Sequence, residues 1–216
     1  MRIRTVLLTA SFVLLGVAAF GAPASASDAT TGKQLVVTKA DAGANYTASK
    51  GTTQKDTFPQ LAACVGTPVP KRVVTAHVEG PELTNTRDGS FITSSVDFVK
   101  TAAMAKTDRT IVSSPKFADC IAQLAQTQLS SEGTAQVTSQ PVSVKPYGTF
   151  SAAVETHVSG TNNGRPVDLT VVQVGILKGR AELGASFITN GAQPFDQTAA
   201  QAILDKVNRR LGKAKV

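Results

Sequence analysis

The sequence contains no tryptophan, only two cysteines, and few aromatic or charged residues. Aromatic residues make up 5% and charged residues 17% of the 216 residues. The low charge excludes a disordered polyelectrolyte, and 42% hydrophobic residues are enough for a packed core. Two cysteines exclude a disulfide-dense mini-protein and a multi-cysteine metal scaffold. The length suits one domain, or at most two small ones.

The first 26 residues carry the pattern of a secretory signal peptide. Two arginines near the start are followed by an apolar run from Val6 to Phe20, and then by the small residues of 21–26. An N-terminal membrane anchor is the alternative, but the run is shorter than the roughly 20 residues that span a bilayer. We therefore expect cleavage between Ala26 and Ser27.

The expected route is general secretion to the outside of a bacterial cell. Arg2-Ile3-Arg4 is not a twin-arginine pair, no cysteine at the cut would carry a lipid, and no later stretch would span a membrane. The 22 basic and 15 acidic residues give a charge of +7, and loss of the two leader arginines leaves +5. This mild excess favours solubility, and it would suit retention near an anionic envelope polymer. Scattered basic residues, few aromatics and no binding motif disfavour nucleic acid as a partner.

Cys64 and Cys120 are the two cysteines of the chain. In an oxidising compartment two cysteines of one exported domain most simply form a disulfide. Two free thiols and a metal pair are the alternatives. Metal binding would need further ligands, and neither His77 nor His157 lies at a short spacing from a cysteine.

Hydrophobic periodicity predicts an α+β fold. Apolar and polar residues alternate with a period of two over 71–99 and 134–189, whereas helical spacing and capping residues mark 57–65, 101–131 and the segment from Asp196. Asn162-Asn163-Gly164 and Lys178-Gly179 predict tight turns, so the sheet should be largely antiparallel. We expect about five to six strands with helices packed on them and one disulfide. The expected organisation is a signal peptide over 1–26, a partly helical or loose segment over 27–56, and a single domain over 57–216.

Five short motifs carry a resemblance to a known family. They are Leu61 to Pro68, Ser94-Ser95-Val96, Ser114 to Cys120, Lys178-Gly179-Arg180 and Asn208 to Leu211. In this order they resemble the exported sensor-type domains of actinobacteria, similar to the extracellular domain of mycobacterial PknH-type serine/threonine kinases. The resemblance covers roughly 57–212. It implies an antiparallel sheet with helices, a cleft for a ligand, and no catalytic residues. Kinase domains of this type are membrane-tethered and have two disulfides, so this chain resembles a free-standing relative.

No catalytic constellation is visible in the sequence. Ser186 lies in Gly-Ala-Ser-Phe-Ile, which lacks the second glycine of a nucleophile elbow. His77 and His157 fall on the polar positions of their strands, which predicts solvated sheet positions. Glu79 and Glu82 flank Gly80-Pro81, where solvation of a loop is a simpler role than glycosidase-like acid/base chemistry.

Hydroxyl side chains recur on the polar positions of the predicted strands, at Thr93, Ser95, Ser151 and Thr156. They would suit a surface for carbohydrate or peptide. Exposed threonine also simply favours strands, and we prefer this interpretation.

The function expected from the sequence is a secreted, non-enzymatic, sensor-like or ligand-binding domain at or outside the cell envelope. Its partner would be a small molecule, a peptide or an envelope polymer. We expect no cofactor, no metal, no nucleic acid, and no membrane span after cleavage. The alternatives are a secreted hydrolase with a site assembled only by the fold, and a basic envelope-polymer-binding protein. No ligand-binding residue is identified by the sequence.

Overall fold

The computed structural model describes residues 26–51, 57–68, 71–129, 133–162, 165–191 and 195–216. The predicted signal peptide lies outside these residues except for Ala26. Of the predicted turn at Asn162-Asn163-Gly164, the last two residues lie outside them too. Ala26 and Ser27 are the first two residues of helix α2 (Ala26–Leu35). Within the described ranges, no helix is both long and apolar enough to cross a membrane.

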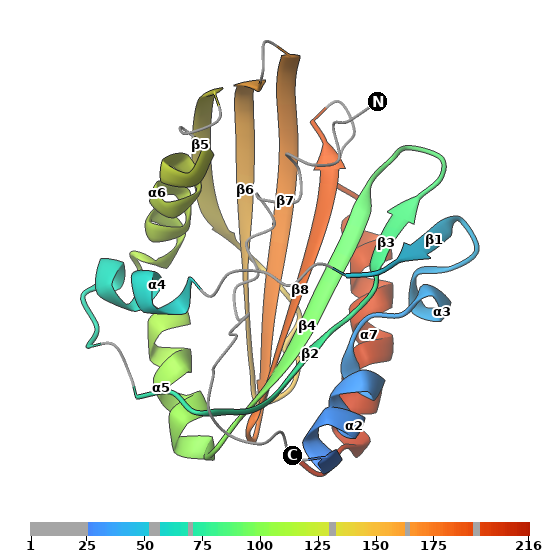
Figure 1. The fold of residues 1–216 in the computed structure, drawn as a ribbon, viewed down its shortest axis with the longest axis vertical. Helices are drawn as coiled ribbons and strands as arrows, with labels where there is room; N and C mark the ends of the chain where they lie inside the picture. Colours follow the sequence, from blue (N-terminus) through green and yellow to red (C-terminus); the bar gives the residue numbers. More distant parts are fainter. Residues whose placement is uncertain (1–25, 52–56, 69–70, 130–132, 163–164, 192–194) are drawn as a thin grey trace.

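In the part of the chain that the structure describes, eight antiparallel strands form one sheet, which Figure 1 shows. Their order is β1-β3-β4-β8-β7-β6-β5, and β2 and β3 share one edge of β4. The strands are β1 (Tyr46–Ser49), β2 (Val74–Glu79), β3 (Glu82–Asn85), β4 (Phe91–Val99), β5 (Gly133–Val142), β6 (Phe150–Asn162), β7 (Arg165–Lys178) and β8 (Ala181–Asn190).

The predicted α+β class and antiparallel sheet are confirmed, but the predicted number of strands is too low. The two additional strands, β1 and β3, have only four residues each and pair with one another. Four residues give too few alternations for a period of two to stand out. β1 also comes from the segment 27–56, for which the sequence predicted only helix or loose chain.

The helices begin and end at recognisable signals. They are α2, α3 (Lys39–Ala42), α4 (Phe58–Val65), α5 (Ala102–Val112), α6 (Phe117–Leu129) and α7 (Gln197–Lys213). Gly66 ends α4 in the left-handed region, at φ 79°. The Thr101 side chain accepts a hydrogen bond from a backbone N–H in the first turn of α5. The Asp196 side chain does the same for α7.

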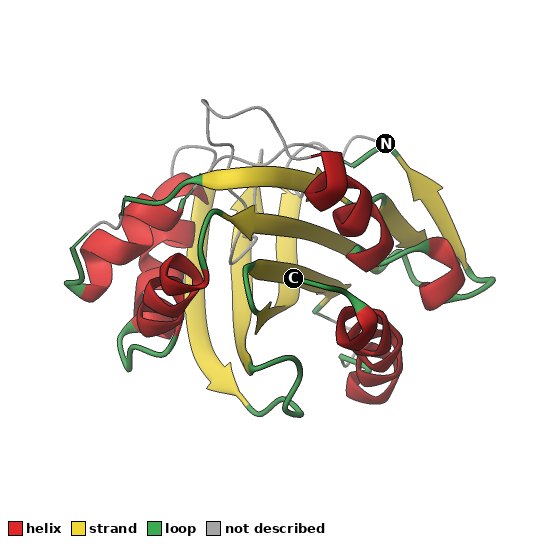
Figure 2. Ribbon diagram, turned by 90° about the horizontal axis from the view of Figure 1, so that it is seen from below, coloured by secondary structure: helices red, strands yellow, loops and turns green. Residues whose placement is uncertain are grey.

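The helices lie in two groups on opposite faces of the sheet (Figures 1 and 2). Neighbouring strand residues point to opposite faces, so Phe98 and Ile176 pack with α2 and α7, whereas Val99 and Leu177 pack with α4, α5 and α6. We call these the α7 face and the α6 face. Each has its own buried apolar cluster, which is why β7 is apolar at both alternating positions.

The disulfide predicted from the cysteine count is confirmed. Cys64 of α4 is bonded to Cys120 of α6, with 5.8 Å between their Cα atoms. Cys120 is buried among Phe117 and Ile121 of its own helix. The bond therefore joins two helices of the α6 face.

The N-terminal segment is tied to the C-terminal helix by an ion pair. The Arg210 guanidinium of α7 donates to both carboxylate oxygens of Asp41 in α3, at 2.6 and 2.8 Å. Asp41 also accepts from the backbone N–H of Thr38, so the same carboxylate caps α3. These bonds lower the pKa of Asp41, although burial alone would raise it. The start of the described chain is thus fixed beside α7.

Candidate functional site

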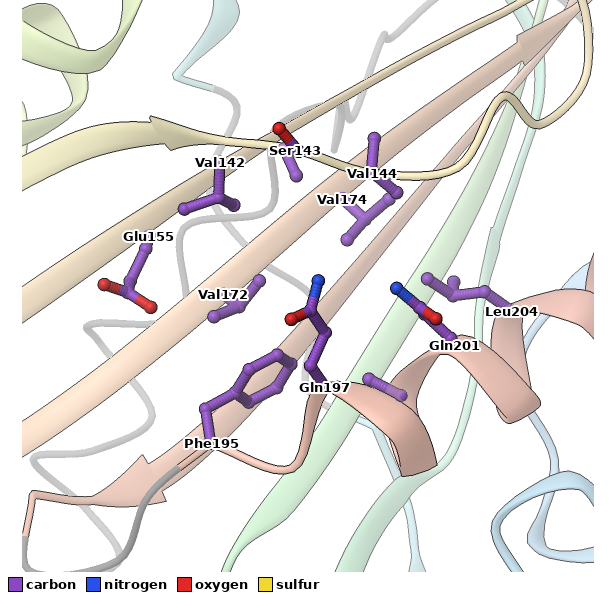
Figure 3. Close-up of a pocket in the computed structure, with 12 residues that line it drawn as sticks. Val142, Ser143, Val144, Glu155, Val172, Val174, Phe195, Gln197, Gln201 and Leu204 are labelled. Carbon is purple, nitrogen blue, oxygen red and sulfur yellow. The ribbon is translucent and has the colours of Figure 1, made fainter.

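A cavity of about 310 Å³ lies on the α7 face, between the first turns of α7 and the strands β5, β6 and β7 (Figure 3). Most of its lining is apolar. Val172 and Val174 of β7 and Leu204 of α7 are buried side chains of the core cluster on this face. Val142 and Val144, which are half-buried, close the side formed by the end of β5.

Phe195 forms one wall of the cavity. Its ring meets the ring of Phe187 edge to face, with 6.0 Å between the ring centroids. The next residue, Asp196, accepts a hydrogen bond from the backbone N–H of Ala199 at 2.9 Å and so fixes the start of α7. Phe195 is therefore held from both sides, by the sheet and by the helix cap.

The mouth of the cavity is polar. Gln197 and Gln201 lie one turn apart on α7, and Glu155 lies across from them on β6 (Figure 3). Ser143, which follows the end of β5, also lines the opening. Glu155 accepts a hydrogen bond from the Gln140 amide at 3.0 Å. Among the described residues that line the cavity there is one carboxylate and no lysine or arginine. The mouth therefore repels an anionic group and can hydrogen-bond a neutral one.

A second feature is a buried ionic cluster centred on Arg72. Its guanidinium donates to Asp108 of α5 at 2.8 Å, to Asp97 of β4 at 3.1 Å, and to Glu182 of β8. The three carboxylate side chains are 0% exposed and that of Arg72 is 7% exposed. Phe58 of α4 lies against the guanidinium, 5.3 Å away. One side chain thus connects two strands and two helices.

The cluster shifts the pKa values of its members. Burial alone would lower the pKa of Arg72, but the charges of Glu182, Asp97 and Asp108 outweigh it and raise that pKa. Burial, together with the charge of Asp108, raises the pKa of Glu182 to about 8, although Arg72 acts in the opposite direction.

His77 belongs to the same cluster, and the prediction of a solvated sheet position for it is wrong. Its Nδ1 lies 2.6 Å from a carboxylate oxygen of Asp97, and its Nε2 lies 2.9 Å from one of Glu79. These hydrogen bonds, with Asp97 the larger cause, raise the pKa of His77 to about 10. The predicted role of Glu79 in solvating a loop is wrong for the same reason. The cause in both cases is the pairing of β2 with β4, which places His77 beside Asp97.

The other candidates from the sequence lie apart from this cluster. His157, whose side chain is 49% exposed, pairs with Asp168 at 2.8 Å. Ser186 is buried in β8. Because both ring nitrogens of His77 face carboxylates, this histidine has no nitrogen left to accept a proton from a serine hydroxyl.

Among the described residues, no group of three or more His, Cys, Asp or Glu is arranged to hold a metal.

The pKa values of His77 and Glu182 predict a pH dependence of stability. Both are raised in the folded chain, from 6.5 to about 10 and from 4.5 to about 8. A group with a raised pKa stabilises the fold fully below its unfolded pKa, and this stabilisation is lost as the pH rises to its folded pKa. We expect the free energy of unfolding, measured with urea, to fall as the pH rises from about 4.5 to about 10.

The variant His77→Gln provides the control, because it removes one of the two groups. It should flatten the decline above pH 6.5, where the histidine contributes, and leave the part caused by Glu182. A wild-type stability that rises over this range would contradict the assignment.

Comparisons with known proteins find likeness to solved structures only. No protein-family model matches the chain, and no curated protein does. The chain is similar to the extracellular domain of PknH from Mycobacterium tuberculosis over 88% of its own length and 100% of that chain, with a TM-score of 0.46 and 13% identity. It is also similar to a protein of unknown function from Pseudomonas aeruginosa, over 57% of this chain and 72% of that one, with a TM-score of 0.26 and 15% identity.

Proposed function

We propose that this protein is a secreted, non-enzymatic, sensor-like domain that binds an apolar small molecule with an uncharged or cationic head group. The observation that carries the proposal is the cavity under the first turns of α7. It is lined by core valines and by Phe195, and it has a polar mouth. Proteins bind small molecules in pockets of about 300–1,000 Å³ that are mostly apolar and carry a few placed polar groups. The cavity is at the lower end of that range.

The apolar lining favours a ligand whose body is hydrocarbon. Val172, Val174 and Leu204 offer no hydrogen bonds, so water inside the cavity would lack partners there. A hydrocarbon group that replaces this water gains by removing apolar surface from solvent on both partners. Lipid-like molecules of the cell envelope have this chemistry.

The mouth selects the head group. Glu155 carries the only charge among the described lining residues, and it would face a ligand carboxylate across the opening. Like charges in a partly buried site repel one another, whereas a hydroxyl or an amine can donate to the same carboxylate. The amides of Gln197 and Gln201 offer both donors and acceptors. We infer that an alcohol binds better than the acid of the same chain length.

The proposal also places the protein outside the cell, since the leader pattern over 1–26 supports export. A cut after Ala26 removes only the first residue of α2 and keeps Asp28, whose carboxylate pairs with Arg180 at 2.9 Å. N-terminal sequencing of the exported protein should begin at Ser27, and an intact leader would argue against the proposed site.

A fluorescent apolar probe tests the cavity. N-phenyl-1-naphthylamine is neutral, and its fluorescence should rise on titration into the protein. Val142→Phe places a ring in the cavity from a half-buried position, and it should weaken probe binding at least roughly tenfold by filling the space. The matched control is Val137→Phe on the same strand, because Val137 packs on the other face.

Competition with that probe tests the head group. Dodecanol should displace N-phenyl-1-naphthylamine at lower concentration than dodecanoate does, and Glu155→Gln should reduce the difference. Equal binding of the probe to wild type and Val142→Phe would reject the cavity as the site. Preference for dodecanoate would reject the role of Glu155.

A further inference from the structure

A second cavity lies on the other flank of α7, toward the edge of the sheet that carries β1 and β3. Its volume is about 310 Å³. Its lining residues come from four parts of the chain, within 42–46, 85–92, 187–190 and 195–203. Figure 1 shows β1 and α3 beside α7 at this edge of the sheet. We call this space the edge cavity.

The floor of the edge cavity is apolar and rich in aromatic rings. Ile92 and Phe187 are buried in the core cluster of the α7 face, and the half-buried Tyr46 and Phe195 pack against that cluster. Phe91 is the fourth aromatic residue of the lining. Aromatic residues make up only 5% of the chain, so four at one cavity are a local concentration. Such rings offer an apolar surface for the C–H groups of a ligand.

The wall toward β3 is polar, and hydrogen bonds within the protein hold it in place. The Asp88 carboxylate accepts from the backbone N–H of Ser90 at 2.8 Å and from the Asn85 amide at 3.1 Å. The Asn190 amide donates to the Asp88 backbone carbonyl at 3.4 Å. All four residues line the edge cavity. These bonds leave lone pairs of the carboxylate and of the Asn190 amide oxygen for a ligand, and groups already held lose little entropy when it binds.

Two further polar groups of the edge cavity have unused bonding capacity. The Thr189 hydroxyl oxygen is buried and has no partner in the part of the chain that the structure describes. Thr189 lies on the same face of β8 as Phe187, because alternate residues of a strand share a face. Buried hydroxyls are almost always hydrogen-bonded. One oxygen of Asp196 caps α7, and the other forms no hydrogen bond or ion pair with a described residue.

The polar groups match a neutral ligand with several hydroxyls. Besides Tyr46, the polar lining consists of three asparagines, one serine, one threonine and two aspartates, with no lysine or arginine among the described residues. An anionic ligand would face both carboxylates without a compensating cation. An ammonium group only donates, so the asparagine N–H groups would stay without an acceptor. Sugar hydroxyls donate to carboxylates and amide oxygens and also accept from amide N–H groups.

We propose that the edge cavity binds a neutral sugar of one or two pyranose rings. The hydroxyls along one edge of the ring bond to Asp88, Asn190 and Thr189, and the apolar C–H face of the ring lies on the aromatic floor. The volume is at the lower end of the range for small-molecule sites, which suits a ligand of this size. Phe195 and Ala200 line both cavities, but the rest of the α7 cavity lies toward β5, β6 and β7. The sugar site therefore does not depend on the function proposed for the α7 cavity.

Amide NMR spectra of the isotope-labelled protein, titrated with maltose, cellobiose and lactose, test the proposal. These sugars are neutral and differ in linkage and in the direction of their hydroxyls. We expect at least one of them to shift the backbone signals of Ser90, Asn190 and Ala199 with a saturable dependence on concentration. The signal of Glu155, at the mouth of the α7 cavity, should not move. Cyclohexylamine is the control ligand, because it has a six-membered ring and a cationic amine but no hydroxyls.

Two variants locate the bound sugar. Ala199→Phe places a ring in the edge cavity from an exposed position and should weaken binding at least roughly tenfold. Its matched control is Ala202→Phe, at an exposed position of α7 that lines neither cavity. Thr189→Val keeps the side-chain volume but removes the hydroxyl, so it should weaken binding roughly threefold to tenfold, the loss of one neutral hydrogen bond. Thr170→Val, its partner on β7 outside the cavity lining, should bind as wild type does.

Three results would overturn the proposal. They are no shift with any of the three sugars, equal affinities of wild type, Ala199→Phe and Thr189→Val, and saturation of the same signals by cyclohexylamine at lower concentration than by every sugar. The spectra also show whether each variant is folded. Normal binding of N-phenyl-1-naphthylamine alongside any of these results would leave the function proposed for the α7 cavity intact. The two proposals can therefore fail separately.

Discussion

Replacement of Arg72 by methionine is expected to lower the free energy of unfolding by about 3–5 kcal/mol, the usual cost of removing one partner from a buried ion pair. Methionine keeps most of the side-chain volume but leaves Asp97, Asp108 and Glu182 without their shared cation. All three carboxylate side chains are fully buried, so water cannot replace the guanidinium. Urea unfolding followed by circular dichroism measures the loss.

Arg180 offers a matched control for this variant. It also pairs with a carboxylate, that of Asp28 at 2.9 Å, but its side chain is about a third exposed. Arg180→Met should therefore cost about 1 kcal/mol or less, as partly exposed ion pairs do. If both methionine variants lose the same stability, burial is not what makes the Arg72 cluster important.

A double variant separates the charge of the cluster from its packing. Asp108→Asn in the Arg72→Met background removes one of the carboxylates that lost their partner. It should recover part of the stability, because fewer uncompensated charges remain buried. No recovery would indicate that the loss in Arg72→Met arises from the contact with Phe58 and from other packing.

The longer elements of this fold were predictable because their signals are local. The alternation along β2, β4 and β5 to β8 spans enough residues to define strands, and Pro59, Gly66 and Asp196 mark helix ends. The turn at Lys178-Gly179 joins β7 and β8 as expected, with Gly179 at φ 59°. These features depend on neighbouring residues, which a single sequence shows directly.

The ionic cluster was not predictable because it depends on pairings that are distant in sequence. Arg72 and Glu182 are 110 residues apart, and Arg72 and Asp108 are 36 apart. Asp97 and His77 occupy the polar positions of their strands, which normally face solvent. Only the arrangement of the sheet and of α5 decides that these positions are buried. The one signal in the sequence is that His77 and Glu79 share a strand face.

The hydroxyl residues and the α7 cavity illustrate the same limit. Thr93, Ser95 and Thr156 share the α6 face, but Ser151 lies on the other face, where its hydroxyl donates to the Lys145 carbonyl. The valines that line the cavity are ordinary core residues in sequence. Whether such residues touch or leave a gap depends on how far α7 stands from the sheet, and no local pattern encodes that distance.

Loss of the disulfide is expected to destabilise the protein by up to about 4 kcal/mol through the entropy of the unfolded chain. Cys64 and Cys120 are separated by 56 residues, so the bond closes a long loop that includes β2, β3, β4 and α5. The double variant Cys64→Ala/Cys120→Ala removes this constraint. Its free energy of unfolding, measured with urea, should be compared with that of the oxidised wild type.

Reduction of the wild-type protein separates the bond from the side chains. Dithiothreitol breaks the bond and keeps both sulfur atoms in place, so reduced wild type should lose most of what the alanine variant loses. The disulfide joins α4 and α6 on the α6 face, whereas the cavity lies under α7 on the opposite face. Binding of N-phenyl-1-naphthylamine should therefore persist in the folded alanine variant. A loss of stability below about 1 kcal/mol would mean that the unfolded chain already holds α4 near α6 without the bond.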